Sequence, residues 1–322
     1  EKVAEGRMRA VRVAAHSTIH RPHPGPLPGG EGEYVLVRAM QLPLVKQLTP
    51  PPDAQAAFRA LAARPHCLFL DSAMRHEALG RYSFLTADPF EYFQIPADKP
   101  DPLAELQQRI APYRSQSITG LPPFQGGAAG LLSYDLGRSL EEIPSPAVDE
   151  FQIPQLAIGL YDTVLAWDHA EDHAWIISHG WPESDDAARV NRARLRIEQF
   201  ESWLRGSANC EAPGGDACSA NGTISREQLA PQFPADFHNQ LTSNFSHQRY
   251  LQAAEQAIEY IHAGDVFQVN LAQRLLHPDD GDPVSLYLRL RNRNPATFAG
   301  YFAGENFQIA SASPERFLKL NG

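Results

Sequence analysis

The sequence has few cysteines and no long apolar run, and each absence argues against a class of protein. Its three cysteines, Cys67, Cys210 and Cys218, are an odd number at spacings that match neither a zinc ribbon nor a CxxC pair. A disulfide framework is therefore not expected, and a reducing cytoplasm is the expected compartment. No window reaches 18 uninterrupted apolar residues, so we expect a soluble protein without a membrane partner.

Basic residues are also scarce relative to acidic ones. The chain has 38 Asp and Glu against 28 Lys and Arg, which gives a formal net charge of -10. A protein that neutralises many phosphates needs the opposite sign, so nucleic acid is not an expected partner. With 322 residues, of which 43% are hydrophobic, the chain is long and apolar enough for about two folded domains.

Generic catalytic motifs are missing as well. The sequence contains no GxxxxGK[ST], no HExxH and no GxSxG, and GGAAG at 126–130 lacks the spacing of a dinucleotide-binding turn. The 12 histidines are scattered, so no metal-binding cluster is visible. These general patterns leave the function open.

Composition divides the chain into two predicted domains. Residues 1–40 combine a basic start with a stretch rich in proline and glycine, which predicts a disordered or mis-called N-terminal extension. Residues 206–236 are small, polar and rich in glycine and proline, as linkers are. The folded domains are therefore expected at 41–205 and 237–322.

The first domain is predicted to be rich in β-sheet. Strand patterns occur at 67–71, 81–87, 126–137, 156–168 and 174–178. The last two, separated by a polar turn, predict a long hairpin. A helix should follow from Ser184 and end at Gly206, outside the sheet, with its apolar face formed by Val190, Ala193, Ile197, Phe200 and Leu204.

The second domain is predicted to mix helices and strands, so that the chain is α+β. A helix capped by Ser246 and ended by Gly264 should cover a sheet, and residues 265–276 alternate as a strand does. A short helix from Pro283 should turn Leu286 and Leu290 inward, and strands are expected near 298–303 and 307–312.

The last segment, SPERFLKLNG, is again typical of a strand. It ends on Asn321-Gly322, the strongest two-residue hairpin signal. A strand left without its partner is a liability that folded domains avoid. We therefore expect the chain to be a fragment whose second domain continues beyond residue 322.

Two features of the second domain could carry chemistry. Gln268, Asn270 and Arg274 lie on the polar side of the predicted strand, although such a face is more often simply solvated. Glu315 is the other candidate, a single carboxylate between Pro314 and Arg316.

Six segments, in order, resemble the component I family of chorismate-using synthases. They are CLFLDSA at 67–73, GRYSFLTADP at 80–89, FQGGAAGLLSYDLGRSLEEIP at 124–144, GDVFQVNLAQR at 264–274, NPATFAGYF at 294–302 and SASPERFL at 311–318. The resemblance implies a sheet-rich N-terminal domain with outer helices, followed by the first part of an α/β chorismate-binding domain with two facing sheets flanked by helices.

Within the family, SYDLGR and FQVNLAQR resemble the aminodeoxychorismate synthase branch. That branch aminates chorismate to 4-amino-4-deoxychorismate, for p-aminobenzoate and folate biosynthesis, with Mg²⁺ as cofactor and ammonia from a glutamine amidotransferase partner. Anthranilate synthase component I, of tryptophan biosynthesis, is the alternative. A non-catalytic, amino-acid-binding regulatory fragment is the second alternative.

The resemblance implies roles for particular residues. Glu315, in SPERF, corresponds to the family's catalytic general acid/base, and the alternative is a surface salt bridge with Arg316. The family's amino-acid pocket, which binds tryptophan in several members, corresponds to Asp71, Ser72, Leu79, Gly80, Arg81, Tyr82, Thr297, Phe298 and Ala299.

The pocket has one departure from the family pattern, at Thr297, where proline is usual. Ser72 and Arg81 could hold an amino acid's charged groups while Phe298 packs on an aromatic ring, but a purely structural use of these residues is the alternative. The family's metal-binding glutamates and PIKGT segment would lie beyond Gly322. We therefore expect no Mg²⁺ ligand within this chain and no synthase activity from the chain as given.

Overall fold

The computed structural model describes residues 43–75, 79–97, 99–206, 224, 226–235, 240–278 and 281–320. All of them belong to one compact unit, Tyr34–Gly322. The predicted extension at 1–40, most of the predicted linker at 206–236 and the terminal Asn321-Gly322 lie outside the described residues.

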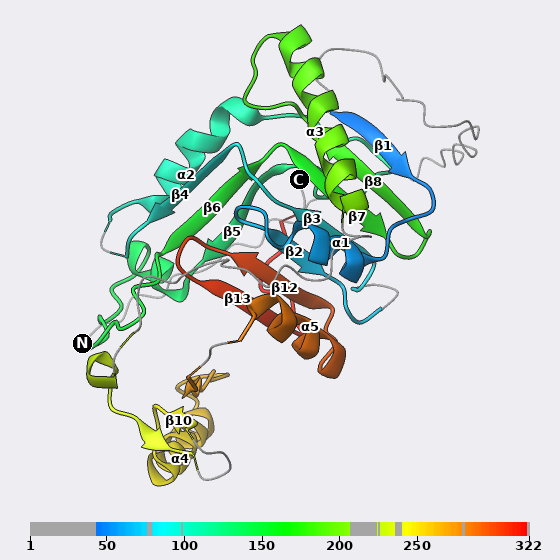
Figure 1. Cartoon of the computed structure of the whole chain (residues 1–322). Coiled ribbons are helices and arrows are strands. Elements are labelled where there is room, and N and C mark those ends of the chain that lie inside the picture. Colours follow the sequence, from blue (N-terminus) through cyan, green and yellow to red (C-terminus); the bar gives the residue numbers. More distant parts are fainter. Residues whose placement is uncertain are drawn as a thin grey trace, which may run out of the picture. The chain divides into compact units, whose positions relative to one another are not determined.

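The centre of the fold is an antiparallel sheet of seven strands in the order β1-β8-β7-β3-β2-β12-β13 (Figure 1). The strands are β1 (Leu44–Leu48), β2 (Leu68–Asp71), β3 (Tyr82–Thr86), β7 (Thr163–Asp168), β8 (His173–Ser178), β12 (Phe298–Ala303) and β13 (Gln308–Ser313). The strands predicted at 67–71, 81–87, 298–303 and 307–312 are thereby confirmed.

Strand β12 pairs with β2, so the two predicted domains contribute to one sheet. The register places Ala299 opposite Asp71 and Tyr301 opposite Phe69. Figure 1 shows β12 and β13, in orange and red, beside the blue β2. The division into 41–205 and 237–322 stays a prediction, but the sheet is common to both segments.

A second antiparallel sheet packs on the first. It has the order β4-β6-β5, with β4 at Glu91–Ile95, β5 at Gly127–Leu132 and β6 at Leu156–Tyr161. Leu68 and Phe302 of the large sheet form one buried cluster with Ala157 and Tyr161 of the small one. Because strand side chains alternate between faces, Phe69, next to Leu68, points to the opposite side.

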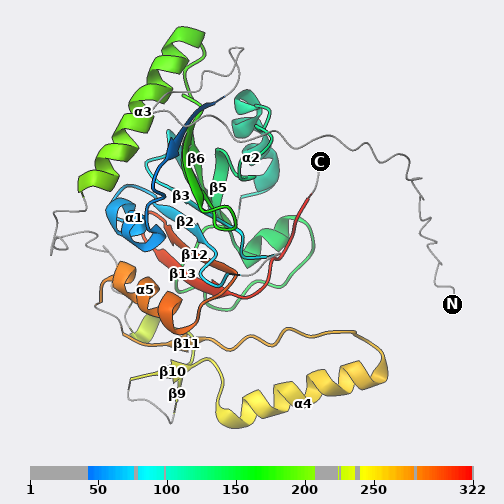
Figure 2. The same ribbon diagram turned by 90° about the vertical axis from the view of Figure 1, so that its right-hand side faces the viewer.

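Helices cover the outer faces of both sheets (Figure 2). Helices α1 (Ala54–Leu61), α3 (Asp186–Gly206) and α5 (Pro283–Arg293) pack on the large sheet, where Phe58, Phe200 and Tyr287 join its core. Helix α2 (Pro102–Ile110) packs Leu106 and Ile110 on the small sheet. The predicted α+β class, with two facing sheets flanked by helices, is confirmed.

Capping residues set several helix boundaries. The side chains of Asp53, Ser246 and Asp282 accept backbone N–H groups at the starts of α1, α4 (His247–Ala263) and α5. Gly264 ends α4 in the left-handed region, at φ 82°, where glycine has no side chain to clash. The cap signals at Ser246 and Gly264 thus predicted α4 correctly.

The remaining elements are short. They are the 3₁₀ helices η1 (Ala111–Tyr113), η2 (Tyr134–Ser139) and η4 (Arg226–Gln228), and the strands β9 (Phe233–Pro234), β10 (Thr242–Ser243) and β11 (Leu275–Leu276). The three strands form a small sheet in the order β11-β10-β9. In the described chain, no helix has both the length and the apolar character needed to cross a membrane.

The predicted long strand at 156–168 is wrong, because the chain changes sheets at Asp162. Strand β6 belongs to the small sheet and β7 to the large one, so only β7 and β8 form the expected hairpin. Asp162 is fully buried, and its carboxylate Oδ1 accepts a hydrogen bond from Arg196 Nε at 3.2 Å. A buried carboxylate needs such a partner, which fixes the break at this residue.

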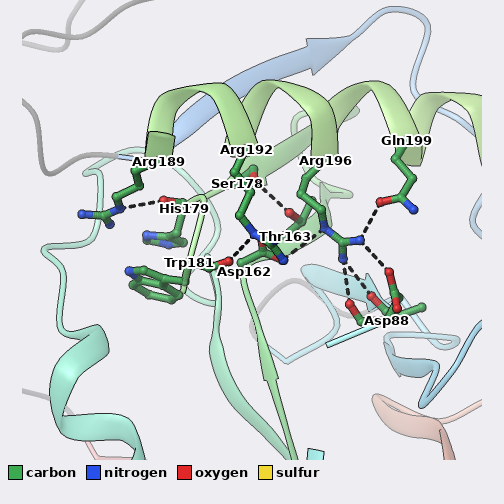
Figure 3. A network of polar contacts seen from close by, with 11 residues as sticks. Asp88, Asp162, Thr163, Ser178, His179, Trp181, Arg189, Arg192, Arg196 and Gln199 are labelled. Carbon is green, nitrogen blue, oxygen red and sulfur yellow. Dashed lines mark hydrogen bonds and ion pairs between the residues drawn. The ribbon is translucent and has the colours of Figure 1, made fainter. Parts of the chain in front are cut away.

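Helix α3 holds this break through a row of arginines (Figure 3). Arg189 Nε donates to His179 O at 2.8 Å and Arg192 Nε donates to Trp181 O at 2.6 Å. The two arginines and Arg196 recur at i, i+3 and i+7, so they lie along one face of the helix. The predicted apolar face of α3 therefore needs correction, because Arg196 is buried and Val190 is 36% exposed.

Three further predictions about packing and strand pairing are wrong. Helix α4 has no buried residue, and the segment from 265 to 274 pairs with no strand among the described residues, leaving only β11 in a ladder. In α5, Leu286 is exposed and its neighbours Tyr287 and Leu288 are buried instead. Tyr287 is buried because its hydroxyl reaches Asp71 of β2, a contact that spacing alone does not reveal.

Candidate functional site

The predicted amino-acid pocket residues meet where β2 ends and where β3 and β12 begin. Ser72, directly after β2, donates a hydrogen bond from its Oγ to Tyr82 O at 2.6 Å. The same Oγ lies 3.4 Å from Thr297 O, just before β12. Ser72 and Thr297 are both buried. The structure therefore brings together residues that lie more than 200 positions apart in the sequence.

Asp71 is used to hold helix α5 on the sheet. Its buried carboxylate accepts a hydrogen bond from Tyr287 Oη at 2.9 Å and from Arg291 Nε at 2.5 Å, and both partners lie on α5. Burial and the neighbouring Asp71 charge raise the pKa of Tyr287, so this hydroxyl stays protonated and donates. Asp71 thus has a structural partner for each of its oxygens, since Arg291 Nη2 lies 3.3 Å from the second.

Arg81 is likewise paired with a carboxylate of this chain, although its own side chain is 40% exposed. Its guanidinium forms a fork on Asp168, with Nε 2.9 Å from Oδ1 and Nη2 2.6 Å from Oδ2, and it lies 5.0 Å from the centre of the Tyr82 ring. Burial alone would raise the pKa of the Asp168 carboxyl, but the hydrogen bonds from Arg81 leave this pKa below its ordinary value.

A serine and a histidine that the sequence analysis missed lie at the same corner, where β2 ends and where β3 and β12 begin. Ser83 Oγ accepts a hydrogen bond from the backbone N–H of Ser72 at 3.0 Å and is 2.7 Å from His169 Nε2. Burial, with a contribution from Arg75, lowers the pKa of His169 to about 4. Asp168 is the last residue of β7 and His169 begins the turn that follows, so an acidic residue next to a histidine at a strand end was the available signal.

The other predicted pocket residues fall at the same corner. Leu79 is exposed, whereas Gly80 is buried. Ala299 is buried and stands opposite Asp71 in the β2–β12 ladder. The ring of Phe298 is covered by the Arg316 guanidinium, 4.9 Å from its centre. These contacts are the structural use that the sequence analysis gave as the alternative, and amino-acid binding stays a prediction.

Glu315 lies in the irregular segment after β13, and its side chain is exposed. The predicted alternative role, a salt bridge with Arg316, is absent from the described residues, where Arg316 lies over Phe298 instead. The backbone around Glu315 is held on both sides. Thr297 Oγ1 donates to Pro314 O at 2.9 Å, and Ser313 Oγ donates to Glu315 O at 3.0 Å.

The polar side chains at 268–274 do not form a compact site among the described residues. Gln268 Nε2 donates to Asn270 Oδ1 at 3.2 Å on an exposed, extended segment. Arg274 forms an ion pair with the buried carboxylate of Glu150 and lies 5.4 Å from the centre of the Phe151 ring. Arg274 thus fastens this segment to the loop that precedes β6.

The described residues do not make a magnesium site. No group of three or more His, Cys, Asp or Glu side chains in that part of the chain is placed to hold a metal ion. Mg²⁺ prefers an octahedral set of oxygen ligands, and one exposed carboxylate does not supply it. We therefore derive no chemical step through a metal.

Known proteins are similar to this chain over most of its length. Aminodeoxychorismate synthase component 1 of Escherichia coli is 29% identical over 283 residues, which is 82% of this chain and 54% of that protein. Anthranilate synthase component 1 of Thermus thermophilus is 33% identical over 223 residues, which is 69% of this chain and 42% of that protein. The chain thus spans about half the length of the curated relatives it matches.

A solved structure shows the same fold. Anthranilate synthase component I from Streptococcus pneumoniae superimposes with a TM-score of 0.52 at 24% identity, over 75% of this chain and 52% of that one. The family model for chorismate binding enzymes matches residues 65–322, which include the small sheet, every strand of the large sheet except β1, and Glu315. This chain therefore belongs to the chorismate binding enzyme family.

Proposed function

We propose that this chain is part of an aminodeoxychorismate synthase component I, which converts chorismate and ammonia to 4-amino-4-deoxychorismate and water. The observation that carries the proposal is the family match over residues 65–322. Within the family, the segments SYDLGR and FQVNLAQR favour this branch. Relatives of both branches match at similar identity, so the product is the part that an experiment must decide.

Glu315 is the proposed general acid/base. Replacing the C4 hydroxyl of chorismate by ammonia requires a proton for the departing oxygen and the removal of a proton from the bound nitrogen. A positioned carboxylate can exchange both protons. The exposed side chain of Glu315, on a backbone held at Pro314 and at its own carbonyl, is available to a substrate.

The ammonia is proposed to come from a glutamine amidotransferase that acts as the second component. The relatives of both branches are named component 1, which supports a two-component enzyme. Free ammonia bypasses such a partner, so the synthase reaction can be tested without it.

The product decides between the two branches. We expect the full-length protein, given chorismate, ammonium and Mg²⁺, to form 4-amino-4-deoxychorismate without releasing pyruvate, as followed by chromatography and mass spectrometry. Anthranilate together with one equivalent of pyruvate would overturn the assignment in favour of anthranilate synthase. Tryptophan binding with no chorismate consumption would favour the regulatory alternative.

The role of Glu315 is tested by Glu315→Gln, which keeps the shape of the side chain but cannot exchange a proton. We expect kcat to fall by about 10²–10⁴, with KM for chorismate within a few-fold of wild type. Glu305→Gln is the matched control, because Glu305 is also exposed and lies in the turn between β12 and β13. A Glu315→Gln enzyme that keeps half of the wild-type kcat would remove Glu315 from the active site.

A further inference from the structure

Three consecutive residues around Glu315 are each anchored to the end of the β12–β13 hairpin. Pro314 O accepts from Thr297 Oγ1 at 2.9 Å, Glu315 O accepts from Ser313 Oγ at 3.0 Å, and the Arg316 guanidinium lies 4.9 Å from the centre of the Phe298 ring. In the described residues, the Glu315 carboxylate itself has no hydrogen bond or ion pair. Its position is therefore set by the backbone that carries it.

The Thr297 contact lies where the strand ladder stops. The register of β12 and β13 ends at Phe298 opposite Ser313. The next residue, Pro314, has no N–H and cannot continue the ladder, but its carbonyl oxygen still needs a donor. The Thr297 hydroxyl supplies that donor. Thr297 is only 4% exposed, so its hydroxyl has little access to water as another partner.

The side chain at 297 is suited to this task. A β-branched residue has a restricted χ1, so its hydroxyl is held in one direction with little loss of entropy. Only a side chain with a hydroxyl can donate this bond, since a valine of the same shape has no donor.

We propose that Thr297 is a positioning residue for Glu315, acting through the hydrogen bond to the Pro314 carbonyl. This inference rests on the proposed role of Glu315 as general acid/base. The Thr297 hydroxyl contacts the Pro314 carbonyl and not the Glu315 carboxylate. It fixes the peptide directly before Glu315, and with it the point from which the carboxylate extends.

The test is Thr297→Val in the full-length protein, which removes the hydroxyl and keeps the branched shape. We expect kcat for chorismate with free ammonia to fall about 5- to 20-fold, the effect of one lost hydrogen bond on positioning, while KM stays within two-fold. Thr297→Ser, which keeps the hydroxyl, should retain kcat within about three-fold of wild type.

Thr86→Val is the matched control. Thr86 is a fully buried threonine of the same sheet, and its Oγ1 donates to the backbone carbonyl of Thr163 at 2.7 Å. The variant removes a hydrogen bond of the same kind away from Glu315, so we expect kcat within about two-fold of wild type. Equal losses of kcat in Thr297→Val and Thr86→Val would overturn the proposal.

Two measurements separate this proposal from the role of Glu315 itself. In a Glu315→Gln background, Thr297→Val should change kcat less than two-fold, because a positioning residue has nothing left to position. NMR order parameters of the Glu315 and Arg316 amides should fall in Thr297→Val, whether or not the enzyme is active, because the segment loses the contact that holds it. Unchanged order parameters overturn the positioning role alone, whereas a fully active Glu315→Gln enzyme overturns the proposed catalytic role and this inference with it.

Discussion

At the scale of single residues, the corner formed by β2, β3 and β12 uses its charged groups for internal pairing. Arg81 is bound by both oxygens of Asp168, and Asp71 is bound by Arg291 and Tyr287. Nε and Nη2 of Arg81 are taken by the pair with Asp168, so an amino-acid ligand could bind Arg81 only through the remaining N–H groups of the guanidinium.

Asp71→Asn tests the structural role of the Asp71 carboxylate. The variant removes the charge opposite Arg291, whose side chain is 14% exposed, and leaves that guanidinium poorly solvated. We expect a loss of about 3–5 kcal/mol in the free energy of unfolding, measured by urea denaturation. Asp172→Asn, at an exposed turn, should stay within about 0.5 kcal/mol. A loss below about 1 kcal/mol would contradict the structural role.

At the scale of elements, helix α3 is fixed by polar contacts as well as by its apolar face. Arg196 donates to Asp162 and to Asp88 Oδ2 at 2.7 Å, and its side chain is 8% exposed. Burial raises the pKa of the Asp162 carboxyl, although the guanidiniums of Arg196 and Arg192 act in the opposite direction. The pair holds α3 to the point where the chain passes from one sheet to the other.

Arg196→Met is expected to destabilise the protein strongly. The variant keeps a long apolar side chain but leaves Asp162 without its main donor, so we expect a loss of about 3–5 kcal/mol in the free energy of unfolding. Arg194→Met changes an exposed arginine of the same helix and should cost less than about 0.5 kcal/mol. Calorimetry of both variants checks the difference, and equal melting temperatures would contradict it.

Local patterns predicted the elements better than their partners. Alternation and caps located β2, β3, β12 and β13, and Ser246 with Gly264 bounded α4, because these signals depend on neighbouring residues. The break at Asp162 depends on Arg196, a residue of another element, so no local pattern could reveal it. The same holds for the pairing of β12 with β2.

In the candidate site, too, the sequence located residues but not their long-range partners. Motif resemblance located Ser72, Tyr82 and Thr297, which the structure brings together. It did not reveal Asp168 or Arg291, the partners of Arg81 and Asp71, since these lie in other segments. Residue type alone does not reveal such pairs, because they depend on three-dimensional contacts between distant segments.

At the scale of the whole molecule, two histidines make stability depend on pH. Burial lowers the pKa of His179 from 6.5 to about 4, with a contribution from Arg189, although the backbone carbonyl of Gln125 acts in the opposite direction. The pKa of His169 is also lowered to about 4. Both folded-state values lie below the unfolded one. The stability from the neutral rings is thus present above about pH 6.5 and is lost as the pH falls through 4.

His179→Gln isolates one of these contributions. Between pH 7 and pH 5, the free energy of unfolding should fall by about 1–2 kcal/mol more in wild type than in the variant, because only the wild-type unfolded state gains this proton. His173→Gln, at an exposed position, should behave as wild type does. Urea denaturation at several pH values measures the slopes, and parallel slopes for wild type and His179→Gln would contradict the prediction.

The pairing of β12 with β2 has a consequence for biosynthesis. Strand β2 is made early, yet one of its edges receives its partner only when Phe298–Ala303 has left the ribosome. At about 5–20 residues per second, the nascent chain carries that open edge for roughly 10 to 50 seconds. An unpaired strand edge can bind another chain, so during this interval β2 is exposed to pairing with the wrong partner.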